Sequence, residues 1–245
     1  PDDNGRYQTL RGVCENNFLI VPFRGTCLSL NDFDDFYNYN FVREPWGFNL
    51  DYLLSFCEYS CNFIKWMSPK NPLCTSASTN QQQFYLQQVR TVIEVIGYME
   101  IVEQDITLFV PKKQEAIAVS EIVAPEISYK MLEYNHYTMK GDIARKRETL
   151  RILADQLEPK RAELATINKE LASNVFFMFN NMNIRHNNRT KGNKNNYKEV
   201  IAEMSQDELE NWYDETYQLC LLAFLELDNV ERTKKVAQLK ASFGK

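Results

Sequence analysis

The sequence predicts a mainly α protein, a helical bundle with long antiparallel helices and room for a small two-stranded β ribbon. Apolar residues recur at helical spacing through most of residues 50–230, whereas only two short segments look extended. Glycine is scarce, with eight in 245 residues, which suits helices joined by polar loops and suits a multi-stranded barrel poorly. We expect an aromatic-rich, mostly helical region over residues 1–139 and a second helical region over residues 140–245.

The first fifty residues are aromatic, rich in turn residues and without a regular period. Residues 18–23 favour a strand, while residues 32–39 alternate aromatics with Asp and Asn and indicate a packed loop or a short helical turn. From Leu50 the apolar residues share one helical face, which predicts a first helix. It ends before a linker at residues 68–80 that is rich in Pro, Ser, Thr and Asn.

A second helix is expected after the linker, with these apolar side chains facing inward: Phe84, Val89, Val92, Ile93, Ile96 and Met99. Residues 106–110 are apolar and β-branched and stop at Pro111, so we expect them to pair with residues 18–23 as the ribbon. Helical spacing returns over residues 115–137. It is interrupted at Pro125, where a helix must end or kink because the ring removes an N–H and clashes with the preceding turn.

The strongest periodic signal follows Gly141. An apolar side chain recurs there every seven residues, at Leu150, Leu157, Leu164, Leu171 and Met178. Because this stripe keeps its phase across Pro159, we expect residues 143–183 to form one kinked rod or two nearly collinear helices.

The last helix is predicted to begin at Ser205, which forms a capping box with Glu208. The acidic residues of its first turn suit the positive end of the helix dipole. The apolar residues that follow, Trp212 among them, are expected to face the core. The tail from Glu231 is mixed in charge and is expected to be solvated.

The formal net charge of -5 and the pI of about 5.3 exclude a protein that coats nucleic acid with a broadly basic surface. Any contact with a polyanion therefore has to be local. No apolar run reaches about 18 residues and no leader pattern opens the chain, so we expect a cytoplasmic protein with no membrane association.

Six cysteines are scattered without paired CxxC spacing, and the chain has only two histidines. Cys57 and Cys61 share one helical face but lack partners for a zinc site. We expect no metal and no cofactor, and we expect the thiols to be buried as small hydrophobic groups.

The sequence contains none of the motifs that mark phosphate loops, dinucleotide sites, serine hydrolases or zinc proteases. A histidine-assisted reaction could use only His136 or His186. Glu133, three residues before His136, could orient that ring for acid–base work; alternatively, His136 simply suits the negative end of a helix dipole.

Residues 180–198 form an asparagine-rich segment, the basic loop, which contains five cations and no carboxylate: Arg185, Arg189, Lys191, Lys194 and Lys198. Arginine offers a planar fork of donors to a phosphate, histidine transfers protons near neutral pH, and asparagine can hold a ribose or an oxyanion. We therefore expect RNA or a nucleotide to bind here, with Arg185 and His186 as candidate catalytic residues. The RNA-binding candidates are Asn183, Asn187, Asn188, Arg189, Lys191, Lys194 and Tyr197.

A structural alternative explains the same composition. The asparagines could cap helix ends and build turns, with the cations forming a solvated rim near the C-terminal end of a helix dipole.

Four features occur in order: the long helix, Arg185 followed at once by the polar His186, the asparagine-rich loop, and a final helix of the form Ser-x-x-Glu-Leu-x-x-Trp-Tyr. Together they resemble the C-terminal part of HEPN-type proteins, the higher eukaryotes and prokaryotes nucleotide-binding domains. The resemblance covers about residues 140–230. It implies a helical bundle, often dimeric, that serves as a ribonuclease in toxin–antitoxin, abortive-infection or other antiphage systems.

The motif of that family is an arginine, a polar residue and, a few positions later, a histidine. Here the positions of the closing histidine hold Thr190, Lys191 and Gly192. The resemblance therefore implies either that His186 takes over the proton transfer or that the domain binds RNA without cleaving it.

Two functions follow from these observations. The first is an RNA- or nucleotide-binding HEPN-like protein of a bacterial defence or toxin–antitoxin system, a candidate metal-independent endoribonuclease that forms a homodimer and meets an antitoxin or defence-system protein. The second is a non-catalytic interaction or sensor module whose apolar helix faces form a dimer or hold a protein partner.

Overall fold

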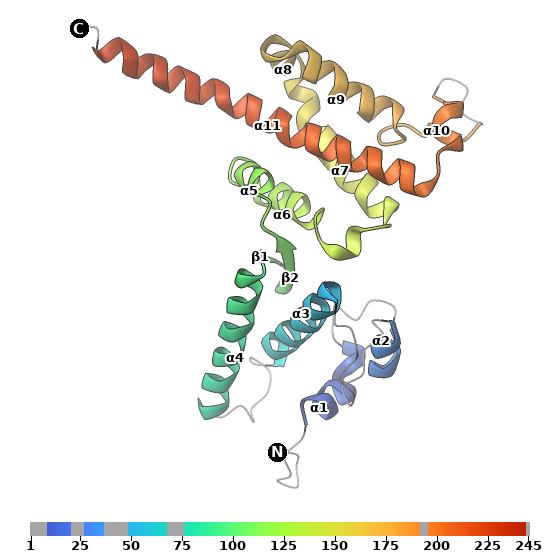
Figure 1. Ribbon diagram of the computed structural model, residues 1–245, viewed down its shortest axis with the longest axis vertical. Coiled ribbons are helices and arrows are strands. Elements are labelled where there is room, and N and C mark those ends of the chain that lie inside the picture. The colour runs from blue at the N-terminus through green and yellow to red at the C-terminus, as the bar shows by residue number, and fades with distance from the viewer. Residues whose placement is uncertain (1–8, 21–26, 37–48, 68–75, 192–195, 244–245) are drawn as a thin grey trace. The chain divides into compact units, whose positions relative to one another are not determined.

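The computed structural model describes residues 9–20, 27–36, 49–67, 76–191 and 196–243 (Figure 1). It confirms a mainly α fold, and the described residues contain one two-stranded antiparallel sheet. The chain divides into two compact units, Pro1–Pro111 and Lys112–Lys245. The boundary lies earlier than the expected one at residue 139, because the two short helices that follow Lys112 pack with the later helices.

The described elements of the first unit are helical up to a terminal hairpin. They are α1 (Leu10–Asn17), the 3-10 helix η1 (Phe18–Ile20), α2 (Leu30–Phe36), α3 (Leu50–Met67), α4 (Ser76–Val95), β1 (Tyr98–Glu103) and β2 (Ile106–Pro111). Their packing centres on α3, and one buried cluster joins η1 and α2 to it through Phe18, Leu30, Tyr59 and Phe63.

The predicted ribbon exists, but its predicted partner strand is wrong. Residues 106–111 pair with the adjacent residues 98–103, and residues 18–20 form a 3-10 helix, while residues 21–23 lie outside the described part of the chain. Gln104 and Asp105 both have positive φ, the geometry of a two-residue hairpin turn. Pairing with the adjacent strand is favoured because closing a two-residue turn costs less conformational entropy than closing a loop of eighty residues or more.

The helix before this hairpin also differs in part from the prediction. Val89 and Ile93 are buried as expected, whereas Phe84 and Val92 are exposed and Met99 lies in β1. The helix begins at Ser76, inside the expected linker, and ends at Val95; Gly97, just beyond it, has a positive φ that suits a residue without a Cβ.

Side chains of α3 hydrogen-bond to the backbone of β2. The Asn62 amide accepts from the Thr107 N–H at 2.6 Å and donates to the Thr107 carbonyl at 2.8 Å. Two residues on, the Glu58 carboxylate accepts from the Phe109 N–H at 2.7 Å. The helix thus supplies the hydrogen bonds that a third strand would make along β2.

The second unit is a helical bundle. It comprises α5 (Gln114–Ser120), α6 (Pro125–Glu133), η2 (Tyr137–Met139), α7 (Ile143–Leu157), η3 (Glu158–Lys160), α8 (Arg161–Ile167), α9 (Lys169–Asn181), α10 (Glu199–Glu203) and α11 (Gln206–Phe243). The long helix α11 packs against α5, α7, α8 and α9 (Figure 1). Pro125 does not kink a helix; it occupies the first turn of α6, where its missing N–H costs nothing.

The start of α11 is confirmed as a capping box. The Ser205 N–H donates to the Glu208 carboxylate at 2.9 Å, and the Glu208 N–H donates to the Ser205 hydroxyl at 3.2 Å. Trp212, expected in the core, is about half exposed instead.

The expected rod over residues 143–183 is wrong, because the chain reverses at Asn168. This residue has extended backbone angles, and its side chain accepts a hydrogen bond from the Leu171 N–H at 3.0 Å, so it caps a new helix. In a straight rod Arg161 and Phe176 would lie about 22 Å apart; here the guanidinium lies 4.7 Å from the centre of the ring. The heptad leucines are nevertheless buried, so the stripe faces the core of a helical hairpin.

Within the described residues, no helix combines the length and the apolar character that crossing a membrane requires.

Candidate nucleic-acid-binding loop

The basic loop begins where α9 ends. Asn183 has a φ of +58°, the left-handed conformation that asparagine tolerates better than most residues, and it turns the chain out of the helix. Ile184, next along, is fully buried and anchors the turn in the core. The Arg185 N–H then donates to the Phe179 carbonyl at 3.0 Å, which satisfies one of the last carbonyls of α9.

Asn188 holds the loop together from the inside. Its side-chain oxygen accepts from the Asn183 N–H at 2.7 Å, and its amide nitrogen donates to the carbonyls of Asn196 at 2.7 Å and Asn180 at 3.2 Å. In return the Asn188 N–H donates to the Asn183 side chain at 3.2 Å. With 1% of its surface exposed, Asn188 is a buried and fully used amide, so its primary role is to shape the loop.

Arg189 also serves the fold. Its guanidinium donates to the carbonyls of Met204 at 3.0 Å and Ala202 at 3.4 Å, at the end of α10. A cation placed on the last carbonyls of a helix satisfies unpaired acceptors and meets the negative end of the dipole.

Arg185 is held by carboxylates of the α7–α8 region. Its guanidinium pairs with Glu158, and a second nitrogen lies 3.6 Å from the Asp155 carboxylate. Its side chain keeps 24% of its surface exposed. The two carboxylates fix the position of the guanidinium, and they also offset its charge toward an incoming phosphate.

The remaining candidates form the exposed rim of the loop. His186, Asn187 and Lys191 are exposed, as is the side chain of Lys198 at the far end. The Lys191 ammonium lies 5.9 Å from the centre of the Tyr197 ring, a cation–π distance, so the ring is engaged within the loop. Lys194 lies outside the described residues.

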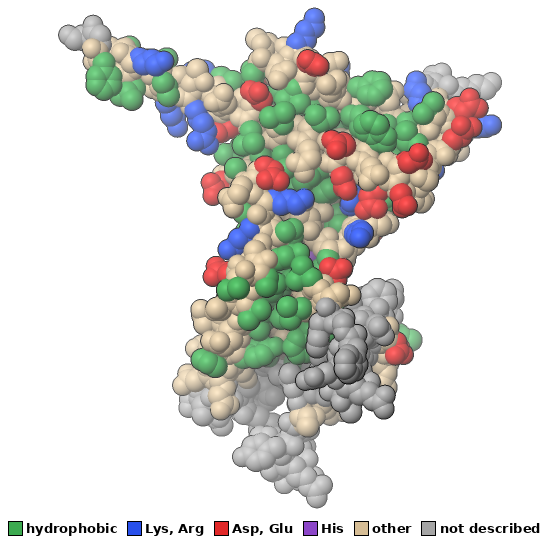
Figure 2. Space-filling model, viewed as in Figure 1, with side chains coloured by type: hydrophobic (Ala, Val, Ile, Leu, Met, Phe, Trp, Pro, Cys, Tyr) green, Lys and Arg blue, Asp and Glu red, His purple; other side chains and the backbone are tan. Residues whose placement is uncertain are grey.

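Acidic side chains stand near this rim. Figure 2 shows carboxylates gathered around α10 and the first turns of α11, where Glu199, Glu203, Asp207 and Glu208 are exposed. The loop rests on α7 and α11 at Tyr213. Burial raises the pKa of that hydroxyl, while the charges of Arg147 and Arg189 and the Asn183 side chain oppose the shift. The exposed cations of the rim therefore have exposed carboxylates of α10 and α11 nearby.

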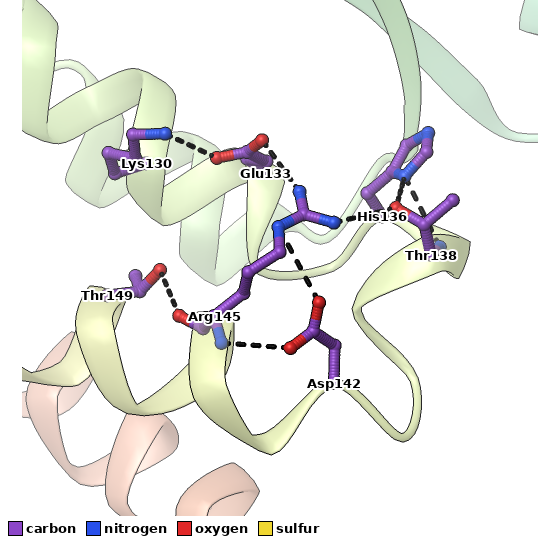
Figure 3. Close-up of polar contacts among 7 residues, drawn as sticks. All are labelled: Lys130, Glu133, His136, Thr138, Asp142, Arg145 and Thr149. Carbon is purple, nitrogen blue, oxygen red and sulfur yellow. Dashed lines mark hydrogen bonds and ion pairs between the residues drawn. The ribbon is translucent and has the colours of Figure 1, made fainter. Parts of the chain in front are cut away.

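The second histidine has a structural role (Figure 3). His136 is buried, and its Nδ1 accepts from the Thr138 N–H at 3.3 Å, capping η2. The Thr138 hydroxyl lies 2.7 Å from the same nitrogen and accepts from Arg145 at 3.2 Å, and Arg145 donates to the Glu133 carboxylate at 2.9 Å. Nδ1 thus helps to hold the first turn of η2.

Close to these hydrogen bonds in sequence lies Lys146, a buried lysine that the sequence pattern alone did not single out. The Lys146 ammonium contacts the carboxylates of Glu210 at 2.7 Å and Asp214 at 2.6 Å, and it lies 5.3 Å from the centre of the Tyr134 ring. The Tyr134 hydroxyl donates to Asp214 at 2.9 Å. The sequence does contain an indication of this cluster. Lys146 precedes Leu150 by four residues and so lies on the buried stripe, and Glu210 and Asp214 are four residues apart on one face of α11.

These contacts set the charge state of Glu210. Burial raises its pKa, but the hydrogen bonds from Lys146 and from the Gly141 N–H and the charges of Lys146 and Lys140 lower it by more, so the pKa lies below its ordinary value. The cluster ties α6 and α7 to α11. Every charge in it has a partner, which is typical of a structural network.

Cys57, Cys61 and Cys220 are buried as predicted, whereas Cys27 is only partly buried. Burial is the main reason that the pKa of Cys57 rises to about 11 and that of Cys61 to about 12, and burial also raises the pKa of Cys220. Among the described residues, no group of three or more His, Cys, Asp or Glu side chains is placed to hold a metal ion.

Comparisons of the chain with protein-family models, with curated proteins and with solved structures find no match.

Proposed function

We propose that the second unit is an RNA- or nucleotide-binding domain of the HEPN-like type and that the exposed rim of the basic loop makes the contact. The observation that supports the proposal is that different residues of the loop have different roles. Asn183, Asn188 and Arg189 secure its backbone, which leaves His186, Lys191 and Lys198 exposed beside a positioned Arg185. A loop that is shaped independently of its exposed cations presents them at little entropic cost.

Arg185 and His186 are the proposed catalytic pair if the domain cleaves RNA. Arg185 would stabilise the charge of the phosphate, in competition with Glu158, and His186 would transfer the proton without a metal. Asn187 and Tyr197 would contact the nucleotide, and so would Lys194. Such a protein would act in the cytoplasm within a bacterial defence or toxin–antitoxin system, with an antitoxin or defence-system protein as its partner.

The test substitutes exposed lysines of the rim and leaves the residues that shape the loop unchanged. The Lys191→Ala, Lys198→Ala double variant should weaken binding of a labelled single-stranded RNA and lower the slope of log affinity against log salt by about 1.4, since each phosphate contact contributes about 0.7. The matched control replaces two exposed lysines outside the basic loop, Lys113→Ala with Lys169→Ala, and should bind like the wild type. Fluorescence anisotropy over a salt series measures both.

Cleavage is tested separately with His186→Ala. We expect it to bind RNA like the wild type and to lose any cleavage activity, because a proton-transfer group acts mainly in the transition state. If the wild-type protein binds no RNA, or if the double lysine variant binds as well as the wild type, the basic loop is a helix connector only.

A second candidate is a non-catalytic interaction module that forms a homodimer. The observation in its favour is a run of exposed apolar side chains on the outer face of α11: Leu222, Val236, Leu239 and Phe243. Sedimentation equilibrium of the full chain tests for the dimer.

A further inference from the structure

The C-terminal half of α11 continues beyond the helices on which its first half packs. Every described residue from Glu231 to Phe243 is exposed, and Figure 1 shows this part of the helix extending past α8. In Figure 2 its surface carries both apolar and basic side chains. An isolated helix of this length would be marginal in water, so the packed first half of α11 is what holds it helical.

The exposed side of α11 carries a regular seam. Its residues are spaced alternately three and four apart: Leu222, Leu225, Asn229, Arg232, Val236, Leu239 and Phe243. This is the a/d spacing of a coiled coil over three heptads. The buried residues Ala223, Phe224 and Leu227 lie on the opposite side of the helix.

Of the five large apolar side chains of the seam, four have between 46% and 83% of their surface exposed, and Leu225 is partly exposed. Scattered exposed apolar residues are ordinary, but a seam in heptad register is not. Its middle is polar, with Asn229 followed by Arg232, and the apolar residues lie toward the two ends. A polar layer of this kind fixes register and orientation at some cost in stability.

We infer that a second copy of the chain covers the seam, with the two α11 helices antiparallel. In that orientation a positions meet d positions, and one register pairs the six seam residues from Leu222 to Leu239 in matched layers, while Phe243 lies beyond them, opposite Gln218 of the second copy. Leu222 meets Leu239 of the second copy, Leu225 meets Val236, and Asn229 meets Arg232. Apolar layers then close both ends and an amide faces a guanidinium in the middle.

Charge favours the same orientation. The register brings Asp228, beside the seam, next to Lys235 of the second copy, and the twofold symmetry makes this contact twice. A parallel pairing would instead stack Arg232 on Arg232 in the seam and set Lys235 beside Lys240. Within each helix Asp228 already pairs with Arg232 at 2.5 Å, which directs the acidic group toward the polar layer.

This inference gives the proposed homodimer a site and an orientation, and it does not depend on RNA binding. The first test is the mass of the full-length protein by sedimentation equilibrium. Wild type should have twice 28.8 kDa. Val236→Glu with Leu239→Glu should be monomeric. The matched control, Gln238→Glu with Ala241→Glu, adds the same two charges on the side of the helix away from the seam and should remain dimeric. Circular dichroism checks that each variant keeps its helix content.

The orientation is tested by exchanging charges. Asp228→Lys alone and Lys235→Asp alone each create two repulsive contacts and should weaken the dimer about tenfold, whereas the double exchange should restore wild-type affinity to within about threefold. A monomeric wild type at concentrations up to about 100 μM would overturn both the homodimer and its site. A dimer that survives Val236→Glu with Leu239→Glu would place the homodimer elsewhere. Loss of the dimer in that variant without rescue by the charge exchange would refute the antiparallel register.

Discussion

Three asparagines replace backbone partners or permit unusual backbone angles at two turns of the second unit. Asn168 caps α9 by accepting from a backbone N–H, Asn183 adopts a positive φ, and Asn188 accepts from one N–H while donating to two carbonyls. These are the roles for which a short amide is suited, since it can imitate a peptide unit. The composition that suggested RNA binding is therefore explained in part by helix ends and turns.

Replacing Asn188 by Ala should destabilise the protein by about 2–4 kcal/mol, because three backbone groups in a buried turn lose their partner. Urea unfolding followed by circular dichroism measures the change. The matched control is Asn187→Ala, an exposed amide in the same loop that accepts from the Arg189 and Thr190 N–H groups at 3.2 Å; it should cost less than about 1 kcal/mol, because water can take its place at these exposed groups. Equal effects for the two variants would contradict the role of Asn188 as the internal support of the loop.

Glu210 should contribute a pH-dependent part of the stability. Because its pKa is lower in the folded state than in the unfolded chain, its contribution is present at neutral pH and is lost as the pH falls through the folded-state pKa. We expect Glu210→Gln to cost about 1–3 kcal/mol at pH 7, and the difference from wild type to shrink below about pH 4. Urea unfolding from pH 7 to pH 3 gives both curves.

The control for Glu210 is Glu215→Gln, an exposed carboxylate on the same helix, which should change the free energy of unfolding by less than about 0.5 kcal/mol. A constant difference between wild type and Glu210→Gln down to pH 3 would show that the carboxylate contributes through its shape and not through its charge.

At the scale of elements, the heptad stripe predicted burial correctly and the path of the chain incorrectly. Leu150, Leu157 and Leu164 are buried on one side as expected. A period, however, reports only which side of each segment is apolar, and a hairpin of two helices satisfies it as well as a rod. The chain reverses at Asn168, which caps the N-terminus of α9. Asn168 is polar and not part of the apolar stripe, so the stripe gave no sign of the reversal.

Leu164→Ala should cost about 2–5 kcal/mol, since Leu164 is 1% exposed in the α8–α9 hairpin and the substitution leaves a cavity. Ile167→Ala, in the same helix at 37% exposure, is the matched control and should cost clearly less. Thermal or urea unfolding measures both. A Leu164→Ala protein as stable as wild type would place the stripe on the surface.

For the whole molecule, the fold class and most helices could be predicted from local patterns, whereas pairings between distant residues could not. The capping box predicted the start of α11, and Pro125 marked an interruption between α5 and α6, although not as the helix start that it proves to be. The pairing of Arg185 with Glu158 joins residues 27 apart in sequence, and the contact of Lys146 with Asp214 joins residues 68 apart. Neither pairing can be predicted from the spacing of apolar residues, because both depend on which helices pack against each other in the fold.

The same limit applies to the candidate site. The sequence identified the basic loop and its cations, but only the structure separates Asn188 and Arg189, which build it, from His186 and Lys191, which face solvent. Side-chain chemistry is the same in both roles. What distinguishes them is whether backbone acceptors of neighbouring helix ends lie within reach.

The hydrogen bonds from α3 to β2 also bear on how the chain avoids aggregation. A two-stranded hairpin has unpaired backbone groups along its outer edges, and such an edge invites a strand from another molecule. Asn62 and Glu58 already occupy the groups of Thr107 and Phe109 on β2. An incoming strand would have to displace an amide and a carboxylate that are held on a packed helix. The contact that orders the hairpin thus also blocks cross-β growth along that edge.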